Sequence, residues 1–261
     1  MKAEAETPVV DVVVEGDRAD LVLRRPDVLN AMDWTVFDGL AAAADRVASS
    51  DARVLVVRGE GRSFCSGIDF NVFGQVQESP TEMIARAQAG FRKIAALEIP
   101  TIAAVKGHAL GAGLQLALAC DLRVVASDAN LGLLEHRFGI VPDLCGTHRL
   151  PLLVGPARAK RMIWLAEKID GEEAGRIGLA EWVVAADDVD ATADDVAQRV
   201  AAAPPLAVRE VKRLVDAAHL RSVDEGMDGE AAAQERMFAS SDVGEAVSAF
   251  FEKRPPRFTA S

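Results

Sequence analysis

The hydrophobic and polar positions in the first half of the chain follow two alternating periods. Short apolar runs, such as Val54 to Gly59 and Thr101 to Gly107, are typical of buried strands. Longer stretches with apolar residues every three or four positions predict helices. One begins after Asp33, a good N-cap residue, and another after Ser79 with Pro80 at its first helical position. Because strands and helices alternate, the pattern predicts an α/β fold whose parallel strands are joined by helical crossovers.

The two ends of the chain differ from this alternation. The segment VVDVVVEGDRADLVLRRP predicts two strands around a polar turn at Gly16 and Asp17. From Pro151 onward the pattern is mostly helical, with one short strand at AEWVV. A helix break follows at Ala203-Pro204-Pro205, before the last two predicted helices, PPLAVREVKRLVDAAHL and DVGEAVSAFFEKRPPRF. We therefore expect three parts: a disordered N-terminus over residues 1–8, an α/β core over 9–200 and a helical C-terminal region over 201–261.

Composition and charge narrow the class of partner. The chain has 261 residues, is 50% hydrophobic and carries a net charge of -11. A sizeable core is therefore available, and nucleic acid is not expected as a partner because phosphate binding requires a basic surface. A small anionic ligand is still compatible with this charge, since local donors can hold it.

Cysteine usage and hydropathy indicate the compartment. Cys65, Cys120 and Cys145 form no Cys-x-x-Cys pair, so neither a disulfide framework nor a metal site is expected. The acidic N-terminus lacks an apolar signal core, and the longest apolar runs are too short to span a bilayer. We expect a cytoplasmic protein without a membrane partner.

A glycine-containing stretch, GHALGAGLQLALACD, is the first candidate for chemistry. A dinucleotide-binding loop is disfavoured because Leu116 stands where the third glycine of the fingerprint is required. The alternative is an oxyanion hole, in which the N–H of Ala112 at a helix start is joined by the N–H of Ser66 from RSFCSGIDF. Two ordinary glycine turns would explain the same residues, and the pattern alone leaves both interpretations open.

Two carboxylates further along the chain are candidates for proton transfer. Glu135 lies among apolar residues, and Asp143 follows Pro142. A carboxylate in an apolar pocket has a raised pKa and can exchange protons near neutral pH. The structural alternatives are a solvated Glu135 near a helix end and an Asp143 that serves as a turn or N-cap residue. His136 is not selected, because adjacent side chains usually point apart.

Four stretches appear in order along the chain: RSFCSGID, VKGHALGAGLQLALACDLRVV, FGIVPDLCGTHRLPLLVG and FFEKRPPRF. Together they resemble the crotonase superfamily, the enoyl-CoA hydratase/isomerase family, from about Val9 to Phe258. The resemblance implies a crotonase-like spiral of ββα units with a helical C-terminal trimerisation region, assembled as a homotrimer or a dimer of trimers. It also implies an acyl-CoA thioester substrate, with coenzyme A as part of the substrate and no separate cofactor.

The resemblance assigns roles to individual residues. Ser66 and Ala112 match the two backbone donors that hold the thioester carbonyl. The other matches line the path of the acyl-CoA, and they are Val28, Leu29, Gly67, Ile68, Asp69, Gly111 and Lys253. In this family the lysine that matches Lys253 can reach the coenzyme A phosphates of a neighbouring subunit.

The resemblance also places the acid/base positions of the family's hydratases at Gln115 and Glu135. Glutamine cannot titrate, so two-carboxylate hydration is not expected. Asp143 matches an additional aspartate of the dienoyl-CoA isomerase branch, a partial resemblance because that branch has an aspartate where Gln115 stands. Our leading hypothesis is therefore a double-bond shift with a proton shuttle between Glu135 and Asp143. Two alternatives stay open: hydration by Glu135 with a water positioned by Gln115, and acyl-CoA binding without catalysis.

Overall fold

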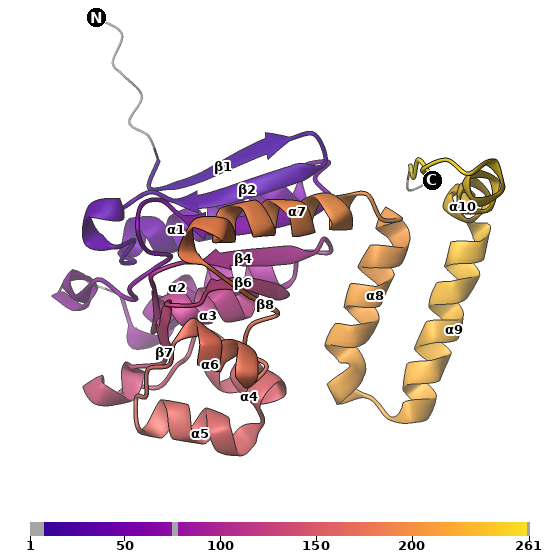
Figure 1. Cartoon of the computed structure of the whole chain (residues 1–261). Helices are drawn as coiled ribbons and strands as arrows, with labels where there is room; N and C mark the ends of the chain where they lie inside the picture. The colour runs from indigo at the N-terminus through magenta and orange to yellow at the C-terminus, as the bar shows by residue number, and fades with distance from the viewer. Residues whose placement is uncertain (1–7, 75–77, 260–261) are drawn as a thin grey trace, which may run out of the picture.

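The computed structural model describes residues 8–74 and 78–259, and the described part is built around a six-stranded sheet (Figure 1). The strand order is β1-β2-β3-β4-β6-β8. The strands are β1 (Val10–Glu15), β2 (Arg18–Leu23), β3 (Val54–Gly59), β4 (Thr101–Val105), β5 (His108–Leu110), β6 (Leu122–Ala126), β7 (Asn130–Gly132) and β8 (Trp182–Val184). Only the first pair, β1 with β2, is antiparallel within this sheet, and every later pairing in it is parallel.

Helices connect and cover these strands. The α-helices are α1 (Trp34–Ala48), α2 (Pro80–Ala95), α3 (Ala112–Ala119), α4 (Gly146–Val154), α5 (Pro156–Trp164), α6 (Gly171–Arg176), α7 (Val189–Ala201), α8 (Pro205–Ala217), α9 (Val223–Ala239) and α10 (Ser241–Glu252). The short 3-10 helices are η1 (Pro26–Val28), η2 (Phe70–Gly74), η3 (Glu135–Phe138), η4 (Ala186–Asp188) and η5 (Ala218–Leu220). In Figure 1, α7 lies in front of the sheet with α1 and α2 behind it. The predicted α/β architecture with parallel crossovers is confirmed.

Local signals in the sequence explain the helix boundaries of the core. The side chain of Asp33 accepts a hydrogen bond from the N–H of Val36 and begins α1. Ser79 and Glu82 form a reciprocal capping box at the start of α2. Both helix starts agree with the predictions. Strand β4 is buried along its whole length, as expected of a central parallel strand.

A second, two-stranded parallel sheet was not predicted. It pairs β5 with β7, each three residues long, and places Leu110 beside Gly132. Strands this short carry too few residues for an alternating pattern to be visible. The pair matters for function because β5 leads directly into the N-terminus of α3.

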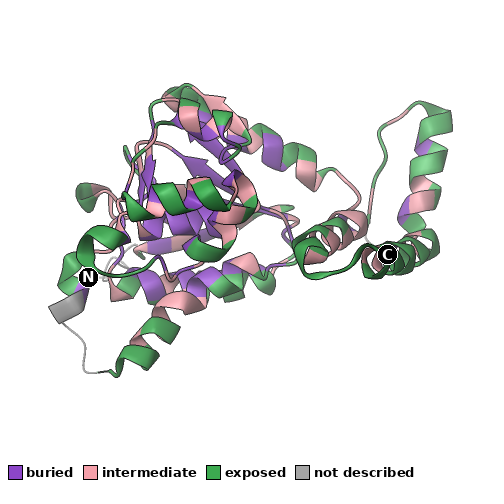
Figure 2. Cartoon of the chain, turned by 90° about the horizontal axis from the view of Figure 1, so that it is seen from below, coloured by how far each residue is buried: buried purple, intermediate pink, exposed green. Residues whose placement is uncertain are grey.

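Helices α8, α9 and α10 form what we call the C-terminal arm, which extends beside the core in Figure 1. Figure 2 shows that its residues are mostly exposed or intermediate, whereas buried residues concentrate in the core. The predicted break at Ala203-Pro204-Pro205 is confirmed, because Pro205 begins α8. Helix α9 was missed, since Gly226 and Gly229 interrupt its weak apolar pattern. The capping box of Ser222 with Glu225 was the available signal.

The remaining expectations about organisation have mixed outcomes. The predicted turn between β1 and β2 is confirmed, and Gly16 adopts the positive φ of 58° that such a turn requires. The N-terminus over residues 1–8 was expected to be disordered, and residues 1–7 of it lie outside the described residues. The boundary near residue 200 between core and C-terminal region stays a prediction. Within the ranges 8–74 and 78–259, none of the helices is both long and apolar enough to cross a membrane.

Candidate functional site

The loop after β3 lies alongside β5 through backbone hydrogen bonds. The N–H of Phe64 donates to the carbonyl of Lys106 at 2.8 Å, and the N–H of Cys65 donates to that of His108 at 2.8 Å. The N–H of Leu110 donates back to the carbonyl of Cys65, 45 positions earlier in the chain, at 3.1 Å. These bonds bring two distant segments of the sequence together, so that residues 66–68 lie next to the start of α3.

The donor expected from this loop has to be corrected. The N–H of Ser66 already donates to the carbonyl of Leu29 at 2.9 Å, so it is not available to a ligand. The next available N–H belongs to Ile68. In the parallel bridge between Met32 and Ile68, Met32 bonds to the backbone of the residues on either side of Ile68, which leaves the N–H of Ile68 facing away from the ladder.

The second donor, Ala112, lies where the sequence predicted it, at the start of a helix. It is the first residue of α3, where N–H groups have no acceptor within the helix. Among the described residues, no hydrogen bond uses the N–H of Ala112 or that of Ile68. The site therefore offers two free backbone donors on adjoining loops. They are the N–H of Ala112 and the N–H of Ile68, which takes the place predicted for Ser66.

Three glycines allow these loops to approach so closely. Gly67 has φ +110°, and a Cβ there would lie 2.9 Å from the carbonyl of Leu110. A Cβ at Gly113 would lie 2.3 Å from the carbonyl of Cys65. Gly111 has φ +53°, and a Cβ there would point at Oε1 of Glu135, 3.4 Å away. Close approach of the backbone therefore requires glycine at Gly67 and Gly113, whereas at Gly111 the positive φ favours it and a Cβ would make only an ordinary contact.

Glu135 is buried, with 6% of its surface exposed, at the start of η3. Its Oε1 accepts a hydrogen bond of 2.7 Å from Nε2 of Gln115, and its buried Oε2 has no partner among the described residues. Burial raises the pKa of Glu135, the bond from Gln115 lowers it by a smaller amount, and the nearby charge of Asp143 raises it. The solvated alternative is therefore wrong, and a carboxylate oxygen is available for proton transfer.

Gln115 is buried on α3, with 1% of its surface exposed. Its Oε1 accepts from the N–H of Leu144 at 2.7 Å and from that of Gly146 at 2.9 Å. These two donors identify the oxygen and leave Nε2 to face Glu135. The oxygen of Gln115 is therefore occupied and one N–H of its amide holds Glu135, so only the second N–H could orient a water, and that role stays a prediction.

Asp143 is half-buried in the segment between η3 and α4, and burial raises its pKa. Asp143 lies in a turn, as one structural alternative predicted, and the N-cap residue of α4 is Cys145, so the N-cap alternative is wrong. The backbone carbonyl of Asp143 accepts a hydrogen bond of 2.7 Å from Nε2 of Gln88 on α2. Tertiary structure thus brings the predicted pair Glu135 and Asp143 within electrostatic reach of each other.

In the part of the chain that the structure describes, the other residues predicted to contact the substrate form no hydrogen bond with the two donors of the site or with Glu135. Val28 is exposed at the end of η1, and Leu29 follows it in the left-handed conformation that presents its carbonyl to Ser66. The carboxylate of Asp69 interacts with Arg25 at 3.4 Å, a partner that the sequence did not indicate. Lys253 is exposed at the end of α10 on the C-terminal arm, so its contact with a neighbouring subunit stays a prediction.

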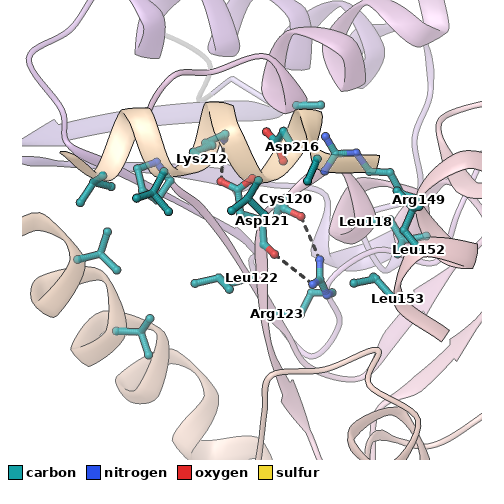
Figure 3. Close-up of a pocket in the computed structure, with 18 of the residues that line it drawn as sticks. Leu118, Cys120, Asp121, Leu122, Arg123, Arg149, Leu152, Leu153, Lys212 and Asp216 are labelled. Atoms are coloured by element: carbon teal, nitrogen blue, oxygen red, sulfur yellow. Dashed lines mark hydrogen bonds and ion pairs between the residues drawn. The ribbon is translucent and has the colours of Figure 1, made fainter. Parts of the chain in front are cut away.

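A groove of about 1230 Å³ lies between α8 and the core; its lining is mostly apolar and also includes the charged side chains of Asp121, Arg123 and Lys212 (Figure 3). Lys212 of α8 donates to Asp121 at 2.7 Å and to the carbonyl of Ile99 at 3.0 Å. Neither the free donors nor the two carboxylates line this groove. It is therefore separate from the candidate active site, and the Lys212–Asp121 pair serves to fasten the C-terminal arm.

No group of three or more side chains suited to a metal ion is found in the ranges 8–74 and 78–259. His136 is exposed beside Glu135. An aromatic pair, Phe70 and Phe138, flanks the site with ring centroids 4.9 Å apart, and both rings are exposed. Phe70 follows the donor loop and Phe138 follows Glu135, so this pair forms an apolar rim beside the carboxylate.

The chain is similar to known proteins over nearly its whole length. A family model described as enoyl-CoA hydratase/isomerase matches residues 18–261. Crotonyl-CoA hydratase from Syntrophomonas wolfei is 37% identical over 243 residues, which is 92% of this chain and 94% of that protein.

Solved structures extend the likeness to the fold. The chain superimposes on an enoyl-CoA hydratase from Bacillus anthracis with a TM-score of 0.92 at 30% identity, covering 97% of this chain and 100% of that one. It also matches a putative enoyl-CoA hydratase from Thermobifida fusca, solved in complex with CoA, with a TM-score of 0.82 at 36% identity, covering 89% and 93% of the two chains. The predicted crotonase-like fold is confirmed.

Proposed function

Since the chain belongs to the enoyl-CoA hydratase/isomerase family, we propose that it shifts a double bond in an enoyl-CoA thioester, with Glu135 as the base. One observation carries this proposal. A single carboxylate, Glu135, is buried beside two free backbone donors, and its neighbour Gln115 is neutral. This arrangement suits a reaction that needs one group to take up a proton and return it elsewhere.

The proposed step conserves every proton. The free Oε2 of Glu135 takes a proton from C2 of a 3-enoyl thioester, and the electron pair moves into a dienolate whose negative charge develops on the thioester oxygen. The N–H groups of Ile68 and Ala112 donate to that oxygen and stabilise it. A proton then returns to C4, either from Glu135 or through Asp143, and leaves the 2-enoyl thioester. Because no electrons leave the substrate, no cofactor is required apart from the coenzyme A that the substrate carries.

The environment of Glu135 supports this role. Burial raises its pKa, which brings the group closer to the pH at which it can both accept and release a proton. Glu135 also lies against Gly111, one residue from the donor Ala112, so base and oxyanion donors adjoin. The exposed rings of Phe70 and Phe138 provide apolar contact for the substrate beside the carboxylate.

Hydration is the second candidate function. It is favoured by the relatives, among which the similar protein of Syntrophomonas wolfei is named a crotonyl-CoA hydratase. In this chain, however, a water would have to be activated by Glu135 without a second carboxylate at position 115. We therefore rank hydration below the double-bond shift.

One substrate series separates the candidates. Purified protein is supplied with 3-enoyl-CoA, 3,5-dienoyl-CoA and crotonyl-CoA, and the products are resolved by chromatography. Double-bond migration that Glu135→Gln abolishes supports the proposal. Crotonyl-CoA hydration without migration supports the second candidate. Acyl-CoA binding without turnover of any substrate leaves only the non-catalytic alternative.

We also propose that the chain assembles as a homo-oligomer, a trimer or a dimer of trimers. Phe250 and Phe251 on α10 are 78% and 77% exposed, and Val211 and Val215 on α8 are exposed as well. Val211 and Val215 line the groove between α8 and the core, so large apolar side chains are exposed both in that groove and on α10, which favours coverage by another subunit. Light scattering of the purified protein tests this, and a monomer at micromolar concentration contradicts it.

A further inference from the structure

The peptide unit that joins Asp143 to Leu144 is bound from two helices. Its carbonyl, on Asp143, accepts from Nε2 of Gln88 on α2 at 2.7 Å. Its N–H, on Leu144, donates to Oε1 of Gln115 on α3 at 2.7 Å. Both polar groups of one peptide are therefore held by glutamine side chains, which fixes the plane of that peptide and with it the backbone at Asp143.

From this we infer that Gln88 is a positioning residue for the reaction and acts through Asp143. The inference rests on the proposed function, in which Asp143 takes part in moving the proton. The hydrogen bonds of Gln88 go to Asp143 and Arg92, whereas Gln115 bonds to Glu135 directly. The position of the Asp143 backbone, from which its carboxylate acts on Glu135, is thus held by a residue of α2 that lies outside the oxyanion loops.

The orientation of the Gln88 amide is itself set by a second contact. Oε1 of Gln88 accepts from Nη2 of Arg92 at 2.8 Å and from its Nε at 3.2 Å, one turn along α2. With its oxygen facing a guanidinium, Gln88 presents its Nε2 to the carbonyl of Asp143. Arg92 therefore supports the arrangement without touching the loop.

The segment that leads into Asp143 is exposed up to Val141, and Pro142 is its first buried residue. Gly139, Ile140 and Val141 are exposed, and Gly139 has a positive φ of 71°. On the other side, Cys145 adopts a φ of 90°, unusual for a residue other than glycine. The buried side chain of Leu144 and the bond from the N–H of Gly146 to Gln115 anchor the far side of this segment, and the bond from Gln88 adds a contact at Asp143 itself.

A double-mutant cycle tests the inference. Gln88→Ala and Asp143→Asn are made singly and together, and kcat and KM are measured for the double-bond shift, with Gln234→Ala on exposed α9 as the matched control. In the parent background we expect Gln88→Ala to lower kcat about tenfold with little change in KM, because small misplacements of a reacting group cost rate more than binding. In the Asp143→Asn background we expect Gln88→Ala to have almost no further effect.

Two more variants separate the loop contact from the helix contact. In Gln88→Glu the carboxylate still pairs with Arg92 but cannot donate to the carbonyl of Asp143, so we expect a loss of kcat at least as large as in Gln88→Ala. Arg92→Ala keeps the donor and is expected to lose less than about threefold. A full kcat for Gln88→Glu contradicts the inference.

The failure of the inference and that of the proposed function are distinguishable. If Glu135→Gln abolishes the double-bond shift while Gln88→Ala lowers kcat equally in both backgrounds, the proposed function holds and the inference is wrong. An active Asp143→Asn variant with unchanged kcat likewise removes the role of Gln88 alone. If no double-bond shift is detected in the parent protein, the proposed function itself fails.

Discussion

The amide of Gln115 donates a hydrogen bond of 2.7 Å to the carboxylate of Glu135, and its oxygen accepts from two backbone N–H groups. A neutral residue thus orients the base and leaves the second oxygen of Glu135 free. The same position on α3 would bring a carboxylate within hydrogen-bonding distance of Glu135. The identity of residue 115 therefore decides how many protons the site can hold.

Gln115→Glu tests this directly. The new carboxylate would face Oε1 of Glu135, and since two such groups cannot both ionise at this distance, the pair would share a proton. We expect the acidic limb of the kcat/KM profile for the double-bond shift to move to higher pH, and crotonyl-CoA hydration to increase. Activity is followed from about pH 5 to 9 for both reactions. An unchanged profile and an unchanged hydration rate would show that residue 115 does not set the chemistry.

Glu135→Gln is expected to remove activity and to stabilise the fold. The double-bond shift should fall by about a hundredfold or more. The glutamine can still accept from Gln115 and removes a buried charge, so we expect the free energy of unfolding to rise by about 1 kcal/mol at neutral pH.

The stabilisation should depend on pH in a defined direction. Burial raises the pKa of Glu135 in the folded chain above its ordinary value of 4.5, so folding favours the protonated form. The contribution of Glu135 to stability is full below pH 4.5 and is lost as the pH rises through the raised pKa. The difference between variant and parent should therefore be small at about pH 4 and grow toward about pH 7, as measured by urea unfolding. A difference independent of pH contradicts the assignment.

Ala112→Pro tests the oxyanion donor with little effect on the helix. Proline is tolerated at the first position of a helix, where its missing N–H has no intrahelical acceptor. We expect kcat to fall by about a hundredfold to a thousandfold, because one of the two donors is lost and the ring intrudes on the oxygen site. Circular dichroism and thermal unfolding monitor the fold. A well-folded variant with full activity would exclude Ala112 as a donor.

Lys212→Met tests the attachment of the C-terminal arm. Lys212 has 9% of its side chain exposed, and it donates to Asp121 and to the carbonyl of Ile99. Its removal should cost about 1–3 kcal/mol, since partly buried acceptors lose a charged donor. Hydrogen exchange in α8–α10 should accelerate more than in α1 or α2, whereas Lys160→Met on an exposed position of α5 should change neither. Uniform acceleration across the chain would argue against a local attachment.

Much of the fold is predictable from the sequence because its signals are local. Asp33, Ser79 and Pro205 each mark a helix start through groups within a few residues, and Val54–Gly59 is apolar over most of the length of one buried strand. Helix α9 and strands β5 and β7 were missed because a weak or very short pattern carries little periodicity. The positions of these two strands are set by partners that lie far along the chain.

For the candidate site, too, part could be predicted from the sequence and part was decided only by the tertiary structure. The sequence names Ala112, Glu135 and Asp143 as candidates, and the resemblance to a known family adds the acid/base position at Gln115. Only the tertiary structure shows that the first oxyanion donor is Ile68 and not Ser66, because the N–H of Ser66 is bound to the carbonyl of Leu29, 37 positions earlier in the chain. It alone also showed that Gln115 holds Glu135, and that Gln88 binds the carbonyl of Asp143. A sequence states which groups can donate or accept, but the pairing of a donor with an acceptor is a property of distance and direction, which only the folded chain determines.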